Sequence, residues 1–179
     1  MESTTQIFLR VQVSDDESDV VEGESFVGEY AGRVQINSFD FKMSAKPQTG
    51  PKRSNTAVVN NIDFDAVSVS KFFDKASVRF ARLLKEGKVL SEVRITVDQQ
   101  LEENDATKQQ NAIIVFHLLK ARIVDLKLSV SEEKVGSTLK ETVSFSFRNF
   151  AVEYYYKKDK SGDFRDRQAW FETNYVEQA

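Results

Sequence analysis

The sequence predicts a mainly β (α+β) protein, a single closed or nearly closed antiparallel β-barrel with one flanking α-helix and a long extended loop. Apolar and polar residues alternate in several long stretches, and 14 Phe and 5 Tyr add side chains that favour strands. The alternation changes phase at two places, which predicts bulges of the kind that bend strands at barrel corners. Closure of the sheet would remove edges that aggregate. A chain of 179 residues fits one domain, so we expect a single domain over residues 1–179.

The first predicted strand covers residues 6–13, where every second side chain is apolar. Its apolar members are Ile7, Leu9, Val11 and Val13. Residues 14–19 follow as an acidic, turn-forming loop. The next stretch starts with Val34 and Ile36 in one phase and continues with Phe39, Phe41 and Met43 in the other. The change of phase at Ser38 predicts the first bulge.

Residues 45–56 predict a long surface loop, because they hold both prolines and no large apolar side chain. An unstructured loop of this length is uncommon in a compact domain, and it is usually functional or disordered. Its basic residues Lys46, Lys52 and Arg53 suit an arm that contacts protein better than a nucleic-acid patch. Strand character returns between Val58 and Val69.

A single helix is predicted between Asp74 and Gly87. Asp74 is a favourable N-cap residue, and Gly87 supplies a left-handed stop. Phe73, just before the cap, and Val78 have the spacing of a hydrophobic staple. The apolar residues that share one face of this helix are Ala76, Phe80, Leu83 and Leu84.

Four further stretches of strand character follow the helix, separated by polar loops. They cover residues 89–97, 113–130, 143–156 and 170–176. The third stretch changes phase between Phe147 and Phe150, which predicts a second bulge near Arg148 and Asn149.

Two of these segments carry large side chains on both faces, namely residues 113–119 and residues 154–156. The outer face of an isolated antiparallel sheet should be polar, so something has to cover these side chains. The cover is either the helix or a loop of the same chain, or it is a neighbouring subunit, since Tyr and Phe are enriched at interfaces.

The residues that most enzymes use are scarce. His117 is the only histidine and cysteine is absent, so a catalytic triad or a zinc site lacks its usual members. We interpret His117 as a structural strand residue whose polar atoms are satisfied. The acidic residues 15–19 lack the glycine and the distal glutamate of a calcium loop, so we interpret them as a solvated loop. The sequence therefore predicts no enzyme, no cofactor and no metal site.

Charge and hydropathy exclude two further kinds of partner. The net charge of −3 does not suit nucleic acid, whose recognition usually needs a strongly basic face. No stretch approaches the roughly 20 apolar residues of a membrane helix, so membrane insertion is not expected. Residues 1–5 lack the features of a signal peptide. We therefore expect a cytoplasmic assembly component, exported only by a dedicated machine.

Several segments, in their order, resemble the haemolysin-coregulated protein family, the inner-tube subunits of the type VI secretion system. Residues 28–39 are similar to the family's Gly-rich lead into its second strand. Residues 69–77 resemble the entry to its single helix, and residues 141–147 with 152–154 resemble its late strand. Ala169 and Trp170 are similar to its closing aromatic position. The resemblance covers roughly residues 7–170.

This resemblance implies a β-barrel that forms hexameric rings. The rings stack into a tube that is expelled from the cell, so the implied partners are copies of itself, sheath, spike and baseplate proteins, and effector proteins held in the lumen. The resemblance also implies that the long loop bridges neighbouring subunits or rings. The residues implied for that contact are Lys46, Pro47, Gln48, Thr49, Gly50, Pro51, Lys52 and Arg53.

Two alternatives remain open from the sequence. One is a phage-like tail-tube subunit of another contractile injection system, which shares the architecture. The other is a monomeric β-barrel that binds a small ligand, which requires an apolar cavity and no self-association. The chain ends soon after its last predicted strand, so we expect no additional toxin domain.

Overall fold

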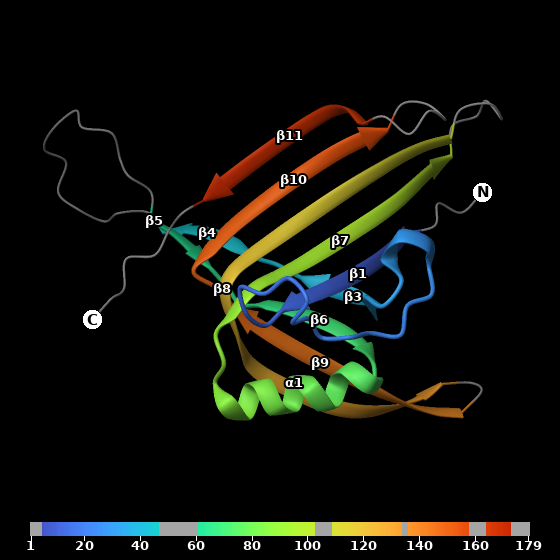
Figure 1. Ribbon diagram of the computed structural model, residues 1–179, viewed down its shortest axis with the longest axis vertical. Helices are drawn as coiled ribbons and strands as arrows, with labels where there is room; N and C mark the ends of the chain where they lie inside the picture. The colour runs from blue at the N-terminus through green and yellow to red at the C-terminus, as the bar shows by residue number, and fades with distance from the viewer. Residues whose placement is uncertain (1–4, 47–60, 103–108, 134–135, 158–163, 173–179) are drawn as a thin grey trace, which may run out of the picture.

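The computed structural model describes residues 5–46, 61–102, 109–133, 136–157 and 164–172 (Figure 1). Within them the protein is mainly β with one α-helix, as the sequence predicts. In chain order the elements are β1 (Thr5–Gln12), the short 3₁₀ helix η1 (Gly28–Tyr30), β2 (Val34–Ile36), β3 (Ser38–Asp40), β4 (Met43–Lys46), β5 (Asn61–Phe64), β6 (Val67–Phe72), α1 (Lys75–Glu86), β7 (Leu90–Glu102), β8 (Gln109–Glu133), β9 (Gly136–Ser146), β10 (Asn149–Lys157) and β11 (Phe164–Glu172).

The 25-residue strand β8 organises the main antiparallel sheet. Its first half pairs with β7 on one edge and β10 on the other, and its second half pairs with β9. The strand order is β2-β1-β7-β8-β9-β6-β3, and β10 and β11 extend the sheet beside the first half of β8. β4 and β5 form a separate two-stranded ribbon. The two halves of the main sheet lie at an angle, with α1 beneath the half that contains β9 (Figure 1).

The prediction of a closed or nearly closed antiparallel barrel is confirmed in part: the sheet is antiparallel, but within the described residues it does not close into a barrel. The end strands of the sheet, β2 and β3, do not pair with each other: β2 pairs with β1, and β3 pairs with β6. They cannot lie side by side because a single residue, Asn37, joins them end to end. Its N–H donates to the carbonyl of Ser70 at 2.7 Å. The phase change expected as a bulge at Ser38 is therefore a change of strand partner.

The second phase change lies where the sequence predicts it, as a break between two strands. β9 ends at Ser146 and β10 begins at Asn149, and both run antiparallel along β8. The N–H of Arg148 donates to Leu119 O at 3.0 Å across the break. Opposite it, Lys120 has a left-handed backbone with φ of 51°. The β8 strand therefore bends at the point where its neighbour changes from β10 to β9.

Helix α1 is confirmed with both of its predicted ends. The Asp74 side chain accepts a hydrogen bond from Ala76 N, and Gly87 ends the helix with φ of 58°. Ala76, Phe80 and Leu83 are buried against core residues of both halves of the sheet. These core residues include Leu9, Val11, Val69, Val93, Ile95, Leu118, Val143 and Phe145. One face of each half of the sheet is therefore core, and η1 covers part of the opposite face, where Tyr30 stacks on the buried Phe8.

Candidate assembly surfaces

The ribbon of β4 and β5 is the base from which the predicted inter-subunit loop extends. Lys46, the last residue of β4, pairs with Asn61, the first residue of β5. The seven remaining residues predicted to make the contact, from Pro47 to Arg53, lie outside the described residues. The structure thus gives the base of the loop, and the contact itself stays a prediction.

This ribbon is anchored in an aromatic cluster at its inner end. Phe64 lies 5.9 Å from Phe147 and 6.1 Å from Phe150 between ring centroids, and Phe41 stacks on Phe150 at 4.7 Å. Further along the ribbon the side chains become exposed. Met43 lies opposite Phe64 and is 46% exposed, and Ile62, two residues from Phe64, is 39% exposed. An apolar face thus continues from the core into solvent.

A second apolar surface lies on the ribbon formed by the end of β8 and the start of β9, called the β8–β9 ribbon below. Leu126 packs on the core, and the next two side chains of that face, Leu128 and Val130, are 50% and 65% exposed. Leu139 pairs with Val130 and is also exposed. Phe73 is exposed as well, and its N–H donates to Leu139 O at 3.0 Å. The core face of the sheet therefore runs beyond the helix that covers it.

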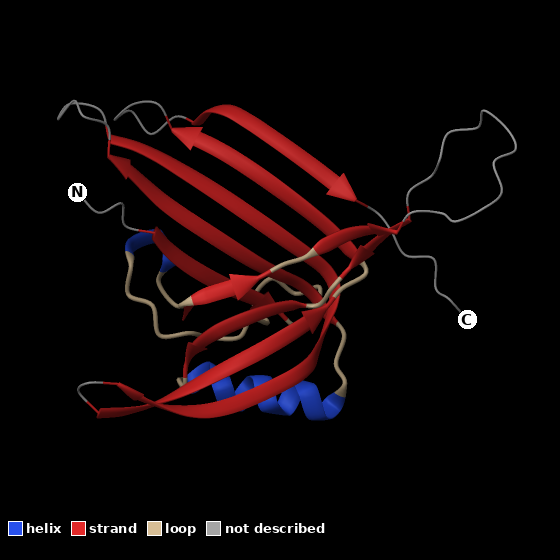
Figure 2. Cartoon of the chain, turned by 180° about the vertical axis from the view of Figure 1, so that it is seen from behind, coloured by secondary structure: helices blue, strands red, loops and turns tan. Residues whose placement is uncertain are grey.

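The two apolar ribbons project from opposite sides of the molecule. Figure 1 shows β4 and β5 at the left and the β8–β9 ribbon at the lower right, and Figure 2 shows the same separation from behind. Scattered exposed apolar residues are ordinary, but contiguous apolar faces mark interaction sites. Two different faces on opposite sides suit head-to-tail contacts, which close into rings when the rotation between subunits allows it.

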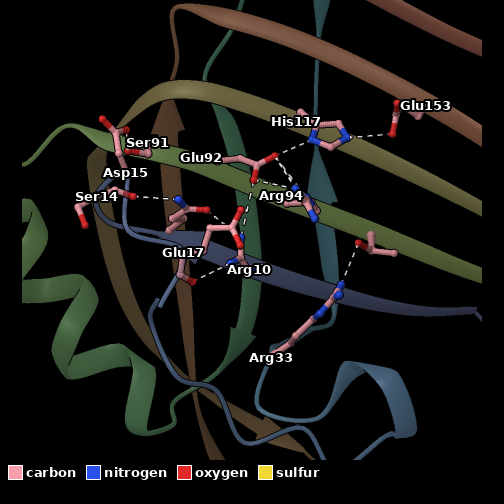
Figure 3. Close-up of polar contacts among 12 residues, drawn as sticks. Arg10, Ser14, Asp15, Glu17, Arg33, Ser91, Glu92, Arg94, His117 and Glu153 are labelled. Atoms are coloured by element: carbon pink, nitrogen blue, oxygen red, sulfur yellow. Dashed lines mark hydrogen bonds and ion pairs between the residues drawn. The ribbon is translucent and has the colours of Figure 1, made fainter. Parts of the chain in front are cut away.

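The outer face of the first half of β8 carries His117 in a polar network (Figure 3). Its Nδ1 lies 2.6 Å from Glu92 Oε1 on β7, and its Nε2 lies 3.3 Å from Glu153 Oε2 on β10. Tyr155 O–H donates to the same Glu153 oxygen at 2.5 Å. Arg94 donates to both oxygens of Glu92. The histidine predicted to be structural thus ties three adjacent strands together. No group of three or more His, Cys, Asp or Glu residues suited to a metal occurs among the described residues.

Glu92 makes part of the stability depend on pH. Burial alone would raise the pKa of its carboxyl, but the hydrogen bond from His117 and the charge of Arg94 hold that pKa below its ordinary value. Such a group stabilises the folded state above its unfolded pKa, and this stabilisation is lost as pH falls through the lowered value. We expect Glu92→Gln to be less stable at pH 7 but to lose less stability than the wild type down to about pH 3. Urea unfolding at pH 7 and at about pH 3 measures the free energy of unfolding of both proteins. An equal decline in the two proteins would exclude Glu92 as a source of the pH dependence.

A buried polar network at the start of α1 is the feature that sequence reasoning missed. Lys71 Nζ donates to Asp74 Oδ1 at 2.7 Å, to Ser77 Oγ at 2.9 Å and to Glu141 Oε2 at 3.0 Å. Ser77 Oγ also donates to Glu141 Oε2 at 2.7 Å. Lys71 and Glu141 are fully buried, at 0% and 1% exposure. The network fixes the helix start to β6 and β9, directly beside the exposed Phe73.

The acidic loop after β1 is held against α1. Lys75 Nζ lies 3.1 Å from Glu22 Oε2, and Arg79 lies 3.4 Å from Asp19 Oδ1. The backbone N–H of Lys75 donates to Glu24 Oε1 at 3.1 Å, close to the positive end of the helix. Asp19, from the loop predicted as solvated, and Glu22, just after it, thus form exposed ion pairs with α1.

A family model described as "Type VI secretion system effector, Hcp" matches residues 8–154. That range contains the buried network at the start of α1, His117 with its partners Glu92 and Glu153, and both apolar ribbons. A sequence search of curated proteins gave no match.

Solved structures of similar fold cover nearly the whole chain. Hcp1 from Salmonella typhimurium is 16% identical with a TM-score of 0.59, over 86% of this chain and 91% of that chain. A structure described as a type six secretion system protein is 16% identical with a TM-score of 0.67, over 93% and 95% respectively. A type VI secretion system effector from Yersinia pestis is 15% identical with a TM-score of 0.59, over 94% and 99%. At these identities the likeness establishes the fold.

Proposed function

Because the chain belongs to the Hcp family of the type VI secretion system, we propose that it is a structural subunit of the secretion tube. It acts by assembling into hexameric rings that stack and leave the cell with the tube, without catalysing a reaction. Sheath, spike and baseplate proteins are its partners in the machine, and effectors in the lumen are its cargo. In the described residues, no helix is both long enough and apolar enough to span a membrane.

The observation that carries this proposal beyond the family is the pair of apolar ribbons on opposite sides. In a ring, each subunit presents one side to the next subunit and the other side to the previous one, so the two interface halves differ. The β4–β5 ribbon with Met43 and Ile62 and the β8–β9 ribbon with Leu128 and Val130 supply two such halves. The contact of either ribbon with a neighbour removes exposed apolar surface from water.

Imaging the purified full-length protein tests the proposal directly. We expect rings with six-fold symmetry by negative-stain electron microscopy, and a hexamer mass by light scattering at micromolar concentration. A strictly monomeric protein across the whole concentration range, with no rings, would argue for the monomeric ligand-binding alternative instead.

The loop between β4 and β5 has a separate expected role in stacking. Replacing residues 47–53 by a short Gly-Ser linker should leave single rings intact but reduce their association into tubes, because the proposed bridge between rings is lost. Ring and tube populations in electron micrographs give the readout, and the circular dichroism spectrum controls for folding. Tubes as long and as frequent as those of the wild type would remove the loop from the stacking contact.

A further inference from the structure

Three arginines lie on the outer face of the sheet, opposite the core. Arg10 on β1 and Arg94 on β7 are direct cross-strand partners in the register of the two strands. Arg33, at the end of the segment between η1 and β2, reaches the same face above Thr96 (Figure 3). Like charges directly opposite each other on a sheet are destabilising, and Glu92 is the carboxylate of the chain that offsets the charges of Arg10 and Arg94.

The carboxylates of the chain itself are shared unevenly among the three arginines. Glu92 pairs with Arg94 at 2.9 Å, lies 3.8 Å from Arg10, and also bonds to His117. Arg33 has neither a carboxylate within ion-pair distance among the described residues nor a short hydrogen bond. Its contacts are a hydrogen bond to Thr96 Oγ1 at 3.4 Å and the ring of Tyr30, 4.9 Å from the guanidinium. Most of its five N–H donors are therefore available to a ligand.

The environment of Arg33 is unfavourable to its charge. Burial lowers the pKa of its guanidinium, and the charges of Arg94 and Arg10 lower it further, whereas Tyr30, with a larger effect than either arginine, and Glu29 oppose this. A guanidinium is almost always charged in proteins, so its partial burial and the neighbouring positive charges lower the stability of the folded protein. An anion bound between the three arginines would relieve it.

The backbone holds Arg33 in place before any ligand arrives. Gly23 N–H donates to Gly32 O at 2.8 Å, and Ser25 N–H donates to Arg33 O at 3.1 Å. A Cβ on Gly23 would lie 2.1 Å from Arg33 O, so the two segments approach as closely as they do because residue 23 is glycine. Tyr30 stacks on Phe8 of β1 at 4.2 Å and supports the turn from below. A fixed cationic group loses little freedom on binding.

We propose that Arg10, Arg33 and Arg94 form a binding site for an oxyanion, a carboxylate or a phosphate group, on the outer face of the sheet. The planar fork of arginine matches two oxygens of either group, and hydrogen bonds between charged groups are among the strongest in proteins. Glu92 keeps Arg94 oriented from the side of the site, and Thr96 orients Arg33. The site is independent of the apolar ribbons, so it stands or falls separately from ring formation.

Calorimetric titration at constant ionic strength tests the site, with inorganic phosphate in one arm and a tetra-aspartate peptide in the other. We expect one anion per chain, and a loss of affinity of about tenfold or more in Arg33→Gln, the size expected for a hydrogen bond to a charged group. Arg82→Gln, a change on the exposed face of α1, is the matched control and should bind like the wild type.

The two arms distinguish the source of the anion. Tighter binding of the peptide identifies an acidic protein segment, and binding of phosphate alone identifies a free anion; either result supports the site. Failure of the wild type to bind both probes, or equal binding by Arg33→Gln, overturns it. Should Arg33→Gln lose its folded circular dichroism spectrum, Arg94→Gln makes the same comparison, because Arg94 lies on β7 rather than in the turn.

Discussion

Replacing Lys71 by Met should lower the free energy of unfolding by about 3–5 kcal/mol, the cost of breaking a buried ion pair by removing one partner. Lys71 is fully buried, and its ammonium donates to two carboxylates, a hydroxyl and the backbone carbonyl of Phe72. Met has a similar length and fills the space, so the loss reports the charge rather than a cavity. Glu141 would remain buried with Ser77 as its hydrogen-bond donor.

Urea unfolding followed by circular dichroism measures the effect, with Lys85→Met in the exposed last turn of α1 as the matched control. The double variant Lys71→Met with Glu141→Leu should be more stable than the single variant, because it removes the orphaned carboxylate along with its partner. A loss as small as that of Lys85→Met would show that the network does not hold the helix to the sheet.

The helix was predictable because its signals are local. Asp74, Gly87 and the apolar face between them lie within 14 residues, and each has its effect through neighbours in the chain. The Lys71 network was not predictable in the same way. Lys71 and Glu141 are 70 positions apart, and they meet only because β6 pairs with β9 in a register that places them opposite each other. Sequence periodicity gives the buried face of a strand but not its partner.

Closure of the sheet into a barrel was wrongly predicted for a related reason. The change of apolar phase at Ser38 correctly located the break between β2 and β3, but a bulge and a change of partner produce the same pattern in sequence. The structure separates the two, because β2 and β3 pair with different strands. The same limit applies to the outer face of the sheet. His117 is one residue in an apolar stretch, and its bonds to Glu92 and Glu153 depend on the order β7-β8-β10.

The sequence predicted that apolar side chains need a cover, but not where the exposed ones lie. The sequence placed large side chains on both faces of residues 113–119 and left open whether a subunit covers them. The structure gives that outer face a polar network, and the exposed apolar ribbon lies elsewhere, at the end of β8 and the start of β9. Alternation in residues 124–130 looked like a strand with a buried face. It could not show that α1 is too short to cover the end of that face.

Replacing Val130 by Asp should abolish ring formation while leaving the subunit folded. Its side chain is 65% exposed in the isolated chain, so the change costs little within the subunit. In the proposed ring the same position is buried against a neighbour, where an unpaired carboxylate loses its hydration. We expect Ile62→Asp on the opposite ribbon to have the same effect, because a head-to-tail contact needs both halves.

Val124→Asp is the matched control, since Val124 lies on the same strand, is 50% exposed and precedes the projecting ribbon by several residues. Light scattering should then give monomers for Val130→Asp and Ile62→Asp, and rings for Val124→Asp and the wild type. A mixture of the two variants should form heterodimers at most, and no rings: the intact β8–β9 ribbon of Ile62→Asp can meet the intact β4–β5 ribbon of Val130→Asp, whereas every further junction contains a substituted ribbon. Rings from Val130→Asp, formed as readily as wild-type rings, would remove the β8–β9 ribbon from the interface while leaving the family membership and ring formation intact.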